Sequence, residues 1–217
     1  MIVFDSVSKL YKTKSMALSD VSMEVPKGEF LLITGSSGAG KSTLLKLMYG
    51  ELKASRGRIV VAGNDLAKIP KRRLSQLRRR MGIIFQDFKL LNDRTVLENV
   101  ALPVAVCKSK NLDPLAKAEE LMREFDLWKY RDHYPLQLSG GEQQKTAICR
   151  ALVMDPLILI ADEPTGNLDP YASTEIFNIF REAWKKGRTV IVATHNERSV
   201  GMHNGRVLRL EGGRLLD

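Results

Sequence analysis

The stretch Gly35-Ser-Ser-Gly-Ala-Gly-Lys-Ser42 decides the fold of this 217-residue chain. It follows a strand-like run at residues 29–34 and precedes residues 43–49, whose composition favours a helix that stops at Gly50. Strand, glycine-rich loop and helix in this order, with the pattern G-x-x-x-x-G-K-S, are typical of a phosphate-binding P-loop. A glycine-rich turn that matches by chance is the alternative, and the flanking strand and helix argue against it.

The residue types of this loop suit a nucleotide. Glycines let backbone N–H groups turn toward phosphate oxygens, Lys41 supplies a countercharge, and the Ser42 hydroxyl is placed for Mg²⁺. The helix that begins there directs the positive end of its dipole at the anion. The expected nucleotide-binding set comprises Gly35, Ser36, Ser37, Gly38, Ala39, Gly40, Lys41, Ser42 and Thr43.

A second motif is the apolar run at residues 157–161, which ends in Asp162 and Glu163. A buried strand that ends in two acids presents both carboxylates at its end. We expect Asp162 to hold Mg²⁺ directly or through water, and Glu163 to polarise the water that attacks the γ-phosphate. Two acids after a strand are commonplace loop residues, so the catalytic interpretation depends on the phosphate loop.

The stretch Leu138-Ser-Gly-Gly-Glu-Gln-Gln144 predicts a second phosphate site. Ser139 and Glu142 form a capping box, which by itself indicates only a well-started helix. The capping box does not account for two adjacent glycines, which each weaken a helix by roughly 1 kcal/mol and expose backbone amides. Since the first loop is already a complete cradle, we expect Ser139, Gly140 and Gly141 to clamp the nucleotide of another molecule.

Strand-like and helix-like segments alternate around these motifs, which predicts a mostly parallel α/β sheet. Residues 87–154 have almost no strand-like run, so we expect one domain with a core at residues 1–86 and 155–217 and an inserted helical subdomain. The tail from Arg206 is typical of a hairpin with a glycine turn. The other expected strands are 2–7, 18–25, 58–61, 81–85 and 189–193, and the other expected helices are 114–125, 141–154 and 170–184.

Composition favours one globular domain in the cytosol. The chain is 44% hydrophobic and 27% charged, which allows a sizeable core. No stretch approaches the roughly 18 to 20 apolar residues of a membrane span, and the first residues lack the features of a signal peptide. Cys107 and Cys149 are too few for a disulfide framework.

Part of the net charge of +9 is concentrated in one short segment of the sequence. This segment has three interpretations: a footprint for nucleic-acid phosphates, a patch attracted to anionic lipid, or the solvated face of a helix. Charge alone does not choose among them. The residues concerned are Lys68, Lys71, Arg72, Arg73, Arg78, Arg79 and Arg80.

Along essentially its whole length the chain resembles ATPase subunits of the ABC family. The motifs that carry the resemblance stand in family order: the phosphate loop, Gln86 after a strand, Ser139-Gly-Gly-Glu, the strand ending in Asp162 and Glu163, Gly166-Asn-Leu-Asp169, and His195. The resemblance implies hydrolysis of ATP with Mg²⁺. It also implies a P-loop NTPase (RecA-like), mostly parallel sheet core with an antiparallel β subdomain and an inserted helical signature subdomain.

The resemblance further implies a head-to-tail homodimer, in which each ATP lies between the phosphate loop of one subunit and Ser139 to Gly141 of the other. Gln86 would touch Mg²⁺ and the attacking water. Asp169 would couple the two sites, and His195 would contact the γ-phosphate. Tyr11 falls where family members often stack an aromatic ring on adenine, although a lone tyrosine fits simple packing equally well.

Within the family, residues 85–103 and 161–169 resemble the branch of the bacterial cell-division ATPase FtsE, the lipoprotein-release ATPase LolD and the macrolide-exporter ATPase MacB. Residues 38–47 and 92–96 are most similar to FtsE. This implies an FtsX-like integral membrane partner at the cytoplasmic face of the inner membrane, and a signal to cell-wall hydrolases. The motor of a lipoprotein-release or macrolide-type exporter is the alternative.

Three positions depart from the family pattern: Lys145, Asn196 and Ala54. None of them removes a phosphate or metal contact, so they affect the choice of branch rather than the ATPase interpretation. An ABC protein that acts on DNA or ribosomes is a further alternative, suggested by the positive charge. The chain lacks the long coiled coil and the second cassette that such proteins carry, so no nucleic-acid partner is expected.

Overall fold

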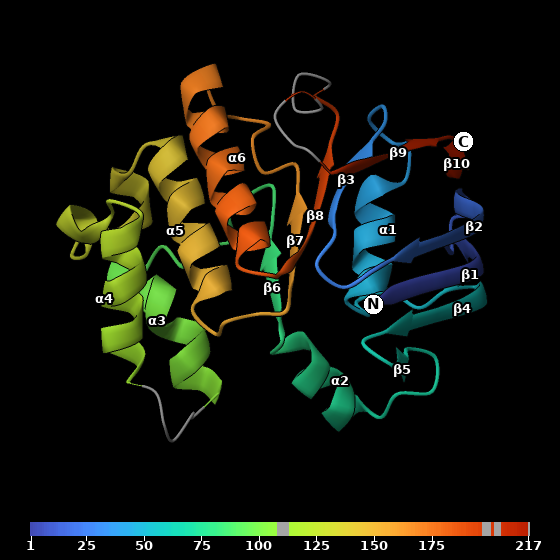
Figure 1. The fold of residues 1–217 in the computed structure, drawn as a ribbon, viewed down its shortest axis with the longest axis horizontal. Coiled ribbons are helices and arrows are strands. Elements are labelled where there is room, and N and C mark those ends of the chain that lie inside the picture. Colours follow the sequence, from blue (N-terminus) through green and yellow to red (C-terminus); the bar gives the residue numbers. More distant parts are fainter. Residues whose placement is uncertain (108–112, 197–200, 202–204, 217) are drawn as a thin grey trace.

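The computed structural model describes residues 1–107, 113–196, 201 and 205–216. Two β-sheets and a set of helices form adjoining layers (Figure 1). The larger sheet lies between a helical layer on one side and, on the other, a helix backed by the smaller sheet. Among the described residues, no helix is both long enough and apolar enough to cross a membrane.

The larger sheet has six strands in the order β10-β9-β3-β8-β7-β6. Neighbouring strands run parallel except in the terminal β9–β10 hairpin. All six residues of β8 are buried, as in a sheet that is covered on both faces. The bounds are β3 Phe30–Thr34, β6 Met81–Ile84, β7 Ile158–Asp162, β8 Thr189–Thr194, β9 Arg206–Glu211 and β10 Arg214–Leu216.

The smaller sheet is antiparallel, with the order β2-β1-β4-β5. Its apolar face and helix α1 (Lys41–Met48) enclose a core cluster that includes Phe4, Leu18 and Leu44. This cluster ties the first strands of the chain to the phosphate loop. The bounds are β1 Ile2–Leu10, β2 Met16–Val25, β4 Arg56–Val61 and β5 Asn64–Asp65.

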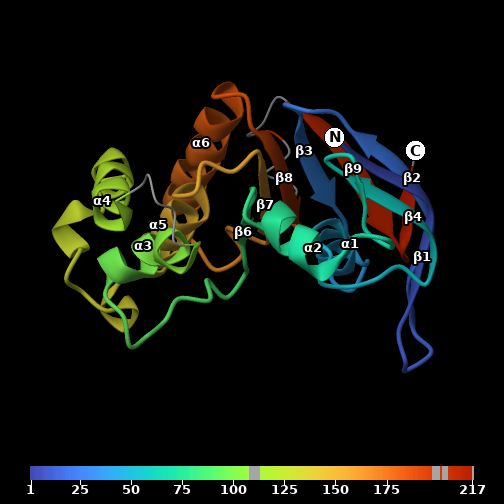
Figure 2. The same ribbon diagram turned by 90° about the horizontal axis from the view of Figure 1, so that it is seen from below.

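Helices cover the other face of the larger sheet (Figure 1). Their apolar side chains join residues of β3, β7 and β8 in a second continuous cluster. Helix α2 (Lys71–Arg78) stands outside both layers and lies on the near side of the molecule in Figure 2. The covering elements are α3 Val96–Cys107, α4 Pro114–Glu124, α5 Gly140–Leu152 and α6 Pro170–Lys185, with short 3₁₀ turns at Trp128–Tyr130 and Pro135–Gln137.

The expected fold class is confirmed, and the expected strands and helices are present with ends that differ by a few residues. Helix α3 has a start signal that sequence analysis did not use: Thr95 and Glu98 form a reciprocal capping box. The division into a core and a helical subdomain at residues 87–154 stays a proposal, because Val96 from one part and Phe30 from the other pack in the same cluster.

Candidate functional site

The phosphate loop borders a pocket of about 550 Å³. It connects the end of β3 to α1, and β7 and β8 end beside it because they are the next parallel strands of the sheet. Ten of the predicted site residues share this pocket with Ser15, Met16 and Ala17 of the first hairpin. The ten are Tyr11, Ser37, Gly38, Gly40, Lys41, Ser42, Thr43, Gln86, Glu163 and His195.

Close packing fixes the backbone of the loop. Gly40 has φ 106°, and a Cβ atom there would lie 2.5 Å from the carbonyl oxygen of Ala17. A Cβ atom at Gly35 would overlap the carbonyl oxygen of Leu210. Both glycines are therefore required by neighbouring backbone as well as by conformation. Gly35, Ser36 and Ala39 do not line the pocket but form the frame behind it.

Lys41 holds the loop together from inside. Its Nζ donates to the carbonyl oxygens of Gly35 at 2.8 Å and Ser36 at 3.1 Å, and lies 3.3 Å from Oε1 of Glu163. Lys41 and Glu163 are 6% and 9% exposed, so little water screens this ion pair. The ammonium group thus stands where the loop amides, the helix terminus and the carboxylate meet.

Glu163 has an unusual backbone conformation, with φ 48°. Its N–H donates to the carbonyl oxygen of Ala193 at 2.8 Å. Its Oε2 accepts the backbone N–H of His195 at 3.1 Å and lies 2.9 Å from the imidazole Nδ1. A non-glycine residue held at positive φ stores roughly 1–3 kcal/mol of strain, and such strain clusters at functional sites. The carboxylate is therefore held from two sides, by Lys41 and by His195.

Asp162 lies behind the pocket, beside Ser42. Burial raises the pKa of Asp162, and the Ser42 hydroxyl acts in the opposite direction. Its Oδ1 is buried without a hydrogen-bond partner in the part of the chain that the structure describes. A buried acceptor of this kind fits a cation or its water shell, and hydroxyl and carboxylate oxygens are the ligands that Mg²⁺ prefers. No cluster of three or more His, Cys, Asp or Glu suited to a metal occurs among the described residues.

Tyr11 lies at the outer end of the pocket. Its hydroxyl is 3.1 Å from Oγ1 of Thr43, and the Lys9 ammonium lies 5.5 Å from the centre of its ring. Tyr11 therefore contacts the start of α1 through its hydroxyl and Lys9 of β1 through its ring. Its place beside the loop is compatible with a base-stacking role, but a packing role accounts for the same contacts.

A second pocket, of about 330 Å³, surrounds the start of α5. Ser139 caps this helix: its Oγ accepts the N–H of Glu142, while Glu142 Oε2 accepts the N–H of Ser139 at 2.8 Å. Asp169 caps α6 by accepting the N–H of Ala172 at 2.9 Å. Ser139, Gly140, Gly141 and Asp169 line this pocket together. Lys145 also lines it and forms an ion pair of 2.8 Å with Glu175.

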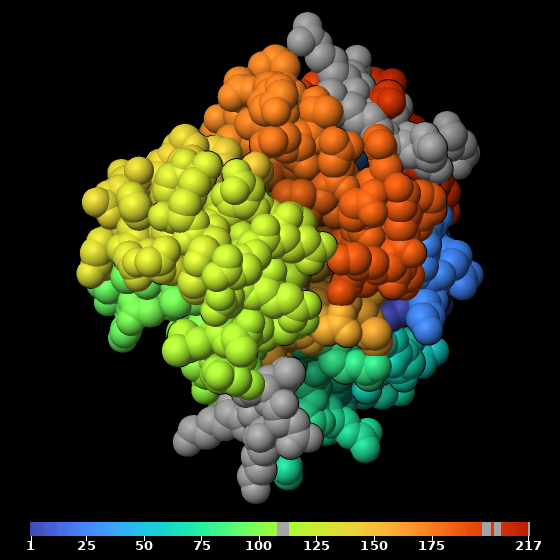
Figure 3. All heavy atoms as spheres, turned by 60° about the vertical axis from the view of Figure 1, so that its left-hand side comes forward, coloured from blue at the N-terminus to red at the C-terminus, as the bar shows by residue number. Residues whose placement is uncertain are grey.

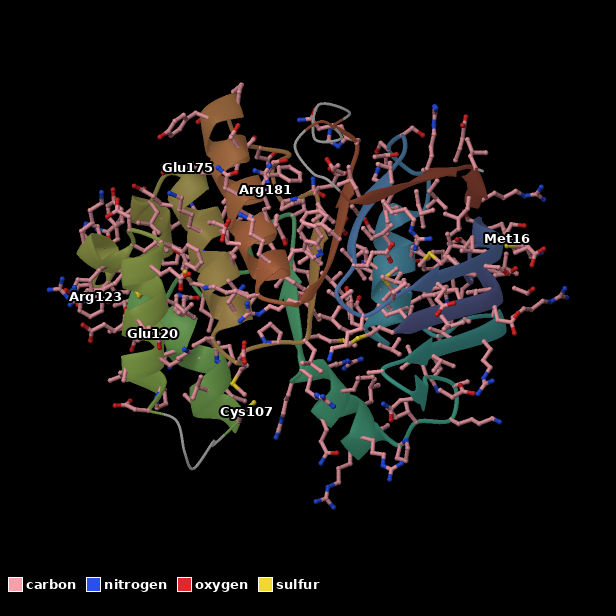
Figure 4. The ribbon with its side chains drawn as sticks, in the orientation of Figure 1. Met16, Cys107, Glu120, Arg123, Glu175 and Arg181 are labelled. Carbon is pink, nitrogen blue, oxygen red and sulfur yellow. The ribbon has the colours of Figure 1, made fainter. Side chains whose placement is uncertain are left out.

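The two pockets are separate and share no lining residue. Met16 lines the first pocket and Glu175 lines the second, and Figure 4 shows these two labelled residues well apart. Within one chain, the predicted residues therefore form two separate groups. The structure places the Lys41 group and the Ser139 group in separate pockets.

Sequence analysis missed Arg150, on the signature helix α5. Its two terminal nitrogens donate to the carbonyl oxygens of Phe88 and Lys89, both at 2.6 Å. Phe88 and Lys89 have φ 58° and 50°, and they follow Gln86 in the chain. Arg150 therefore holds the strained segment at Phe88 and Lys89, which is close in the chain to Gln86 of the first pocket. No local motif reveals this link, because the partners are more than sixty positions apart.

Comparison with known proteins shows the family of this chain. The ABC transporter family model matches residues 18–166. The cell division ATP-binding protein FtsE of Streptococcus pneumoniae is 43% identical over 216 residues, which span 100% of this chain and 94% of that protein. FtsE of Escherichia coli is 42% identical over 215 residues, which span 99% of this chain and 97% of that protein. FtsE of Bacillus subtilis is 41% identical, with 98% and 93% covered.

Solved structures agree with the fold. The dimeric ATP-binding cassette MJ0796, in a post-hydrolysis state bound to ADP and Pi, matches with a TM-score of 0.91 and 32% identity. That match covers 100% of this chain and 97% of the other. The cbiO1 protein of Clostridium perfringens, part of the ABC transporter complex cbiONQ, matches with a TM-score of 0.87 and 29% identity, and 100% and 86% are covered.

Proposed function

The chain belongs to the ABC transporter family of ATPases, and from this membership we propose that it is the ATP-hydrolysing subunit of a cell-division complex at the bacterial membrane. The cell-division role is supported by the sequence identity of 41% to 43% to FtsE proteins, over nearly the full length of both chains. The protein binds and hydrolyses ATP, as its family does.

One observation supports the chemistry most directly. A single pocket contains a buried lysine on a glycine-rich loop and a buried glutamate held by that lysine and by a histidine. A polyphosphate in the loop would compete with Glu163 for Lys41, because the ammonium cannot make its shortest contacts to both. ATP binding would then release Glu163 Oε1 from Lys41.

Hydrolysis follows from this exchange. Glu163 accepts a proton from the attacking water, whose oxygen forms the new bond to the γ-phosphorus. The bond from that phosphorus to the bridging oxygen breaks, and ADP leaves. His195, which lies against Oε2 of Glu163 and lines the pocket, orients the carboxylate and would contact the γ-phosphate. Gln86, at the pocket wall, positions the water.

Ser42, Asp162 and Gln86 are the residues that would hold Mg²⁺. The buried, unpartnered Oδ1 of Asp162 and the neighbouring Ser42 hydroxyl support this assignment. When bound, Mg²⁺ neutralises charge that develops on the phosphate oxygens. The loop amides and Lys41 bind and orient the triphosphate from the other side.

A head-to-tail homodimer completes each site. Ser139, Gly140, Gly141 and Asp169 line a pocket that contains no residue of the phosphate loop of their own chain, so a second subunit would bring them to it. Two large apolar side chains near this pocket, Leu136 and Tyr171, are 78% and 77% exposed, as is common at protein interfaces. The cassette MJ0796 is itself a dimer.

The membrane partner is an FtsX-like integral protein, with the ATPase bound peripherally at the cytoplasmic face. The support is the similarity to FtsE rather than any residue of the site, since an exporter motor would use the same catalytic groups. The role therefore needs a test that identifies the partner, separate from a test of the chemistry.

The variant Glu163→Gln provides both tests. Removing a general base slows its step by roughly 10²- to 10⁴-fold, and the amide keeps the size of the side chain. We expect ATP binding to persist while phosphate release falls by that factor. Phosphate release and equilibrium ATP binding measure the two effects, with Lys41→Ala as the control that loses binding. Wild-type turnover in Glu163→Gln would contradict the role of Glu163.

The same variant, trapped with ATP and Mg²⁺, is then used to isolate its partner from native membranes. Recovery of an FtsX-like protein with regulators of cell-wall hydrolases is the expected result. Recovery of lipoprotein-release or exporter subunits would overturn the cell-division role and leave the ATP chemistry unchanged. Parallel isolation with Lys41→Ala shows which captured proteins depend on bound nucleotide.

A further inference from the structure

The segment that contains α2, residues 68–80, carries a dense cluster of positive charge. Seven basic residues occur between residues 66 and 80, where the sequence has no Asp, no Glu and no aromatic residue. They supply seven positive charges in a chain whose net charge is +9. All seven side chains are exposed. We call them the α2 patch: Lys68, Lys71, Arg72, Arg73, Arg78, Arg79 and Arg80.

The body of the protein holds this patch rigidly. Leu77 is buried, and Leu74 packs against Gly50 at the end of α1. Arg78 donates from Nε to the carbonyl oxygen of Tyr49 at 2.9 Å and from a terminal nitrogen to that of Gly50 at 2.8 Å. The inner face of α2 is thus fixed by two leucines and one arginine. The remaining basic side chains point away from the core.

The charges of the patch are not neutralised within the protein. Among the described residues, no carboxylate forms an ion pair with any of the seven. The nearest acidic position in the sequence, Asp65, is engaged by Arg58 at 2.9 Å. Some other basic residues of the chain differ in this respect: Lys117, Arg123 and Lys185 each pair with a glutamate one turn away. The patch is therefore available to an external anion.

The position of α2 makes the patch accessible to an extended surface. In Figure 2 the helix lies toward the viewer, between the helices α3 to α5 and the smaller sheet, and none of the other labelled elements covers it. In Figure 3 the segment around residue 75 is at the lower edge of the molecule. The nucleotide pocket is not lined by any residue of α2.

We propose that the α2 patch binds directly to the anionic phospholipid headgroups of the membrane surface. Clusters of four to eight Lys and Arg on a helix attract such headgroups, and guanidinium groups pair well with phosphate. A single-stranded nucleic acid is less well matched, because its binding sites combine charge with aromatic rings on which bases stack, and this segment has none. This contact goes beyond the proposed function, since it needs neither ATP nor the protein partner.

The test uses the full chain with phosphatidylcholine vesicles that contain, or lack, phosphatidylglycerol. We expect the wild type to sediment with the anionic vesicles only, and less so at high salt. The double variant Arg72→Glu, Arg73→Glu should bind anionic vesicles at least about tenfold more weakly. Both arginines are exposed, and neither forms a hydrogen bond or ion pair with the residues that the structure describes, whereas Arg78 holds α2 in place.

A matched control separates the patch from net charge. Arg209 and Arg214 of the terminal hairpin are exposed and without an ion-pair partner among the described residues. Arg209→Glu with Arg214→Glu changes the net charge equally and should leave vesicle binding within about twofold. ATPase activity in both double variants reports correct folding. If the glutamate variant of the patch does not fold, Arg72→Gln with Arg73→Gln replaces it.

Three outcomes would overturn the proposal. The wild type fails to bind anionic vesicles at physiological salt. Both double variants lose binding equally, in which case total charge and not the patch is responsible. The wild type binds duplex DNA more tightly than vesicles with the same dependence on Arg72 and Arg73, in which case the surface is a nucleic-acid site. The ATP chemistry of the proposed function is independent of all three.

Discussion

At the scale of single residues, the phosphate loop shows how position and chemistry combine. Gly40 combines a left-handed backbone with a contact to Ala17 that leaves no room for a Cβ atom. Gly63, in the turn between β4 and β5, has a similar positive φ of 77°, but a Cβ atom there would meet no described neighbour within 4 Å. Comparing Gly40 with Gly63 therefore separates the effect of backbone strain, which both positions have, from the effect of steric crowding, which only Gly40 has.

We predict different effects of alanine at these two glycines. Gly63→Ala should lower the free energy of unfolding by about 1 kcal/mol, from backbone strain alone. Gly40→Ala should lower it by about 2–4 kcal/mol, because the loop or strand β2 must also move. Urea unfolding measures both. ATP affinity should fall at least about tenfold only in Gly40→Ala, whose shifted amides no longer converge. Equal effects of the two variants would show that crowding at Gly40 is unimportant.

At the scale of elements, helix α5 joins the two pockets. Its first turn presents Ser139 to the second pocket, and Arg150 in its last turn holds the carbonyl oxygens of Phe88 and Lys89, two and three residues beyond Gln86. A displacement of α5 therefore acts on the segment that carries Gln86. The connection depends on a half-buried guanidinium that reaches two acceptors at once.

We predict that Arg150→Ala slows turnover more than it weakens ATP binding. The strain at Phe88 and Lys89 costs roughly 1–3 kcal/mol per residue, and the segment should relax once Arg150 is removed. We expect kcat to fall by about tenfold or more while KM for ATP changes little, because the loop and Lys41 are untouched. Arg150→Lys, which reaches only one carbonyl, should be intermediate. A rise in KM with unchanged kcat would show that Arg150 supports nucleotide binding instead.

At the scale of the whole molecule, the separation of the two pockets means that one complete ATP site needs two subunits. The phosphate loop and the signature glycines of one chain line separate pockets that share no residue. In a symmetric head-to-tail dimer each composite site takes its loop from one subunit and its signature from the other. Damage to a loop and damage to a signature in different subunits then fall on the same site.

We predict that two inactive variants restore each other. Lys41→Ala removes the loop cation, and Ser139→Arg blocks the second pocket, so each homodimer should be inactive. A mixed dimer has one site with both lesions and one intact site, so an equimolar mixture should regain up to about a quarter of wild-type ATPase activity. Phosphate release after mixing measures this. The unchanged inactivity of the mixture, with mixed dimers demonstrated by affinity tags, would argue against shared sites.

Much of the candidate site was predictable because its signals are local. The loop 35–42 and the acids after β7 are contiguous motifs whose spacing reflects strand, turn and helix geometry. The capping box at Ser139 is likewise present as expected. The ion pair between Lys41 and Glu163 was not predictable from spacing, since it joins the first residue of α1 to the residue after β7 and depends on the order of the strands in the sheet.

The sequence by itself determined the local chemistry: which turn binds phosphate, which strand ends in acids and which helix begins with exposed amides. These features follow from backbone conformation and near-neighbour spacing, which the order of residues specifies. Only the tertiary structure decided that Lys41, Glu163 and His195 share one pocket, that Ser139 and Asp169 share another, and that Arg150 reaches the segment after Gln86. Those contacts depend on the packing of the parallel sheet and its helices, because chain folding brings together residues whose separation in sequence carries no signal.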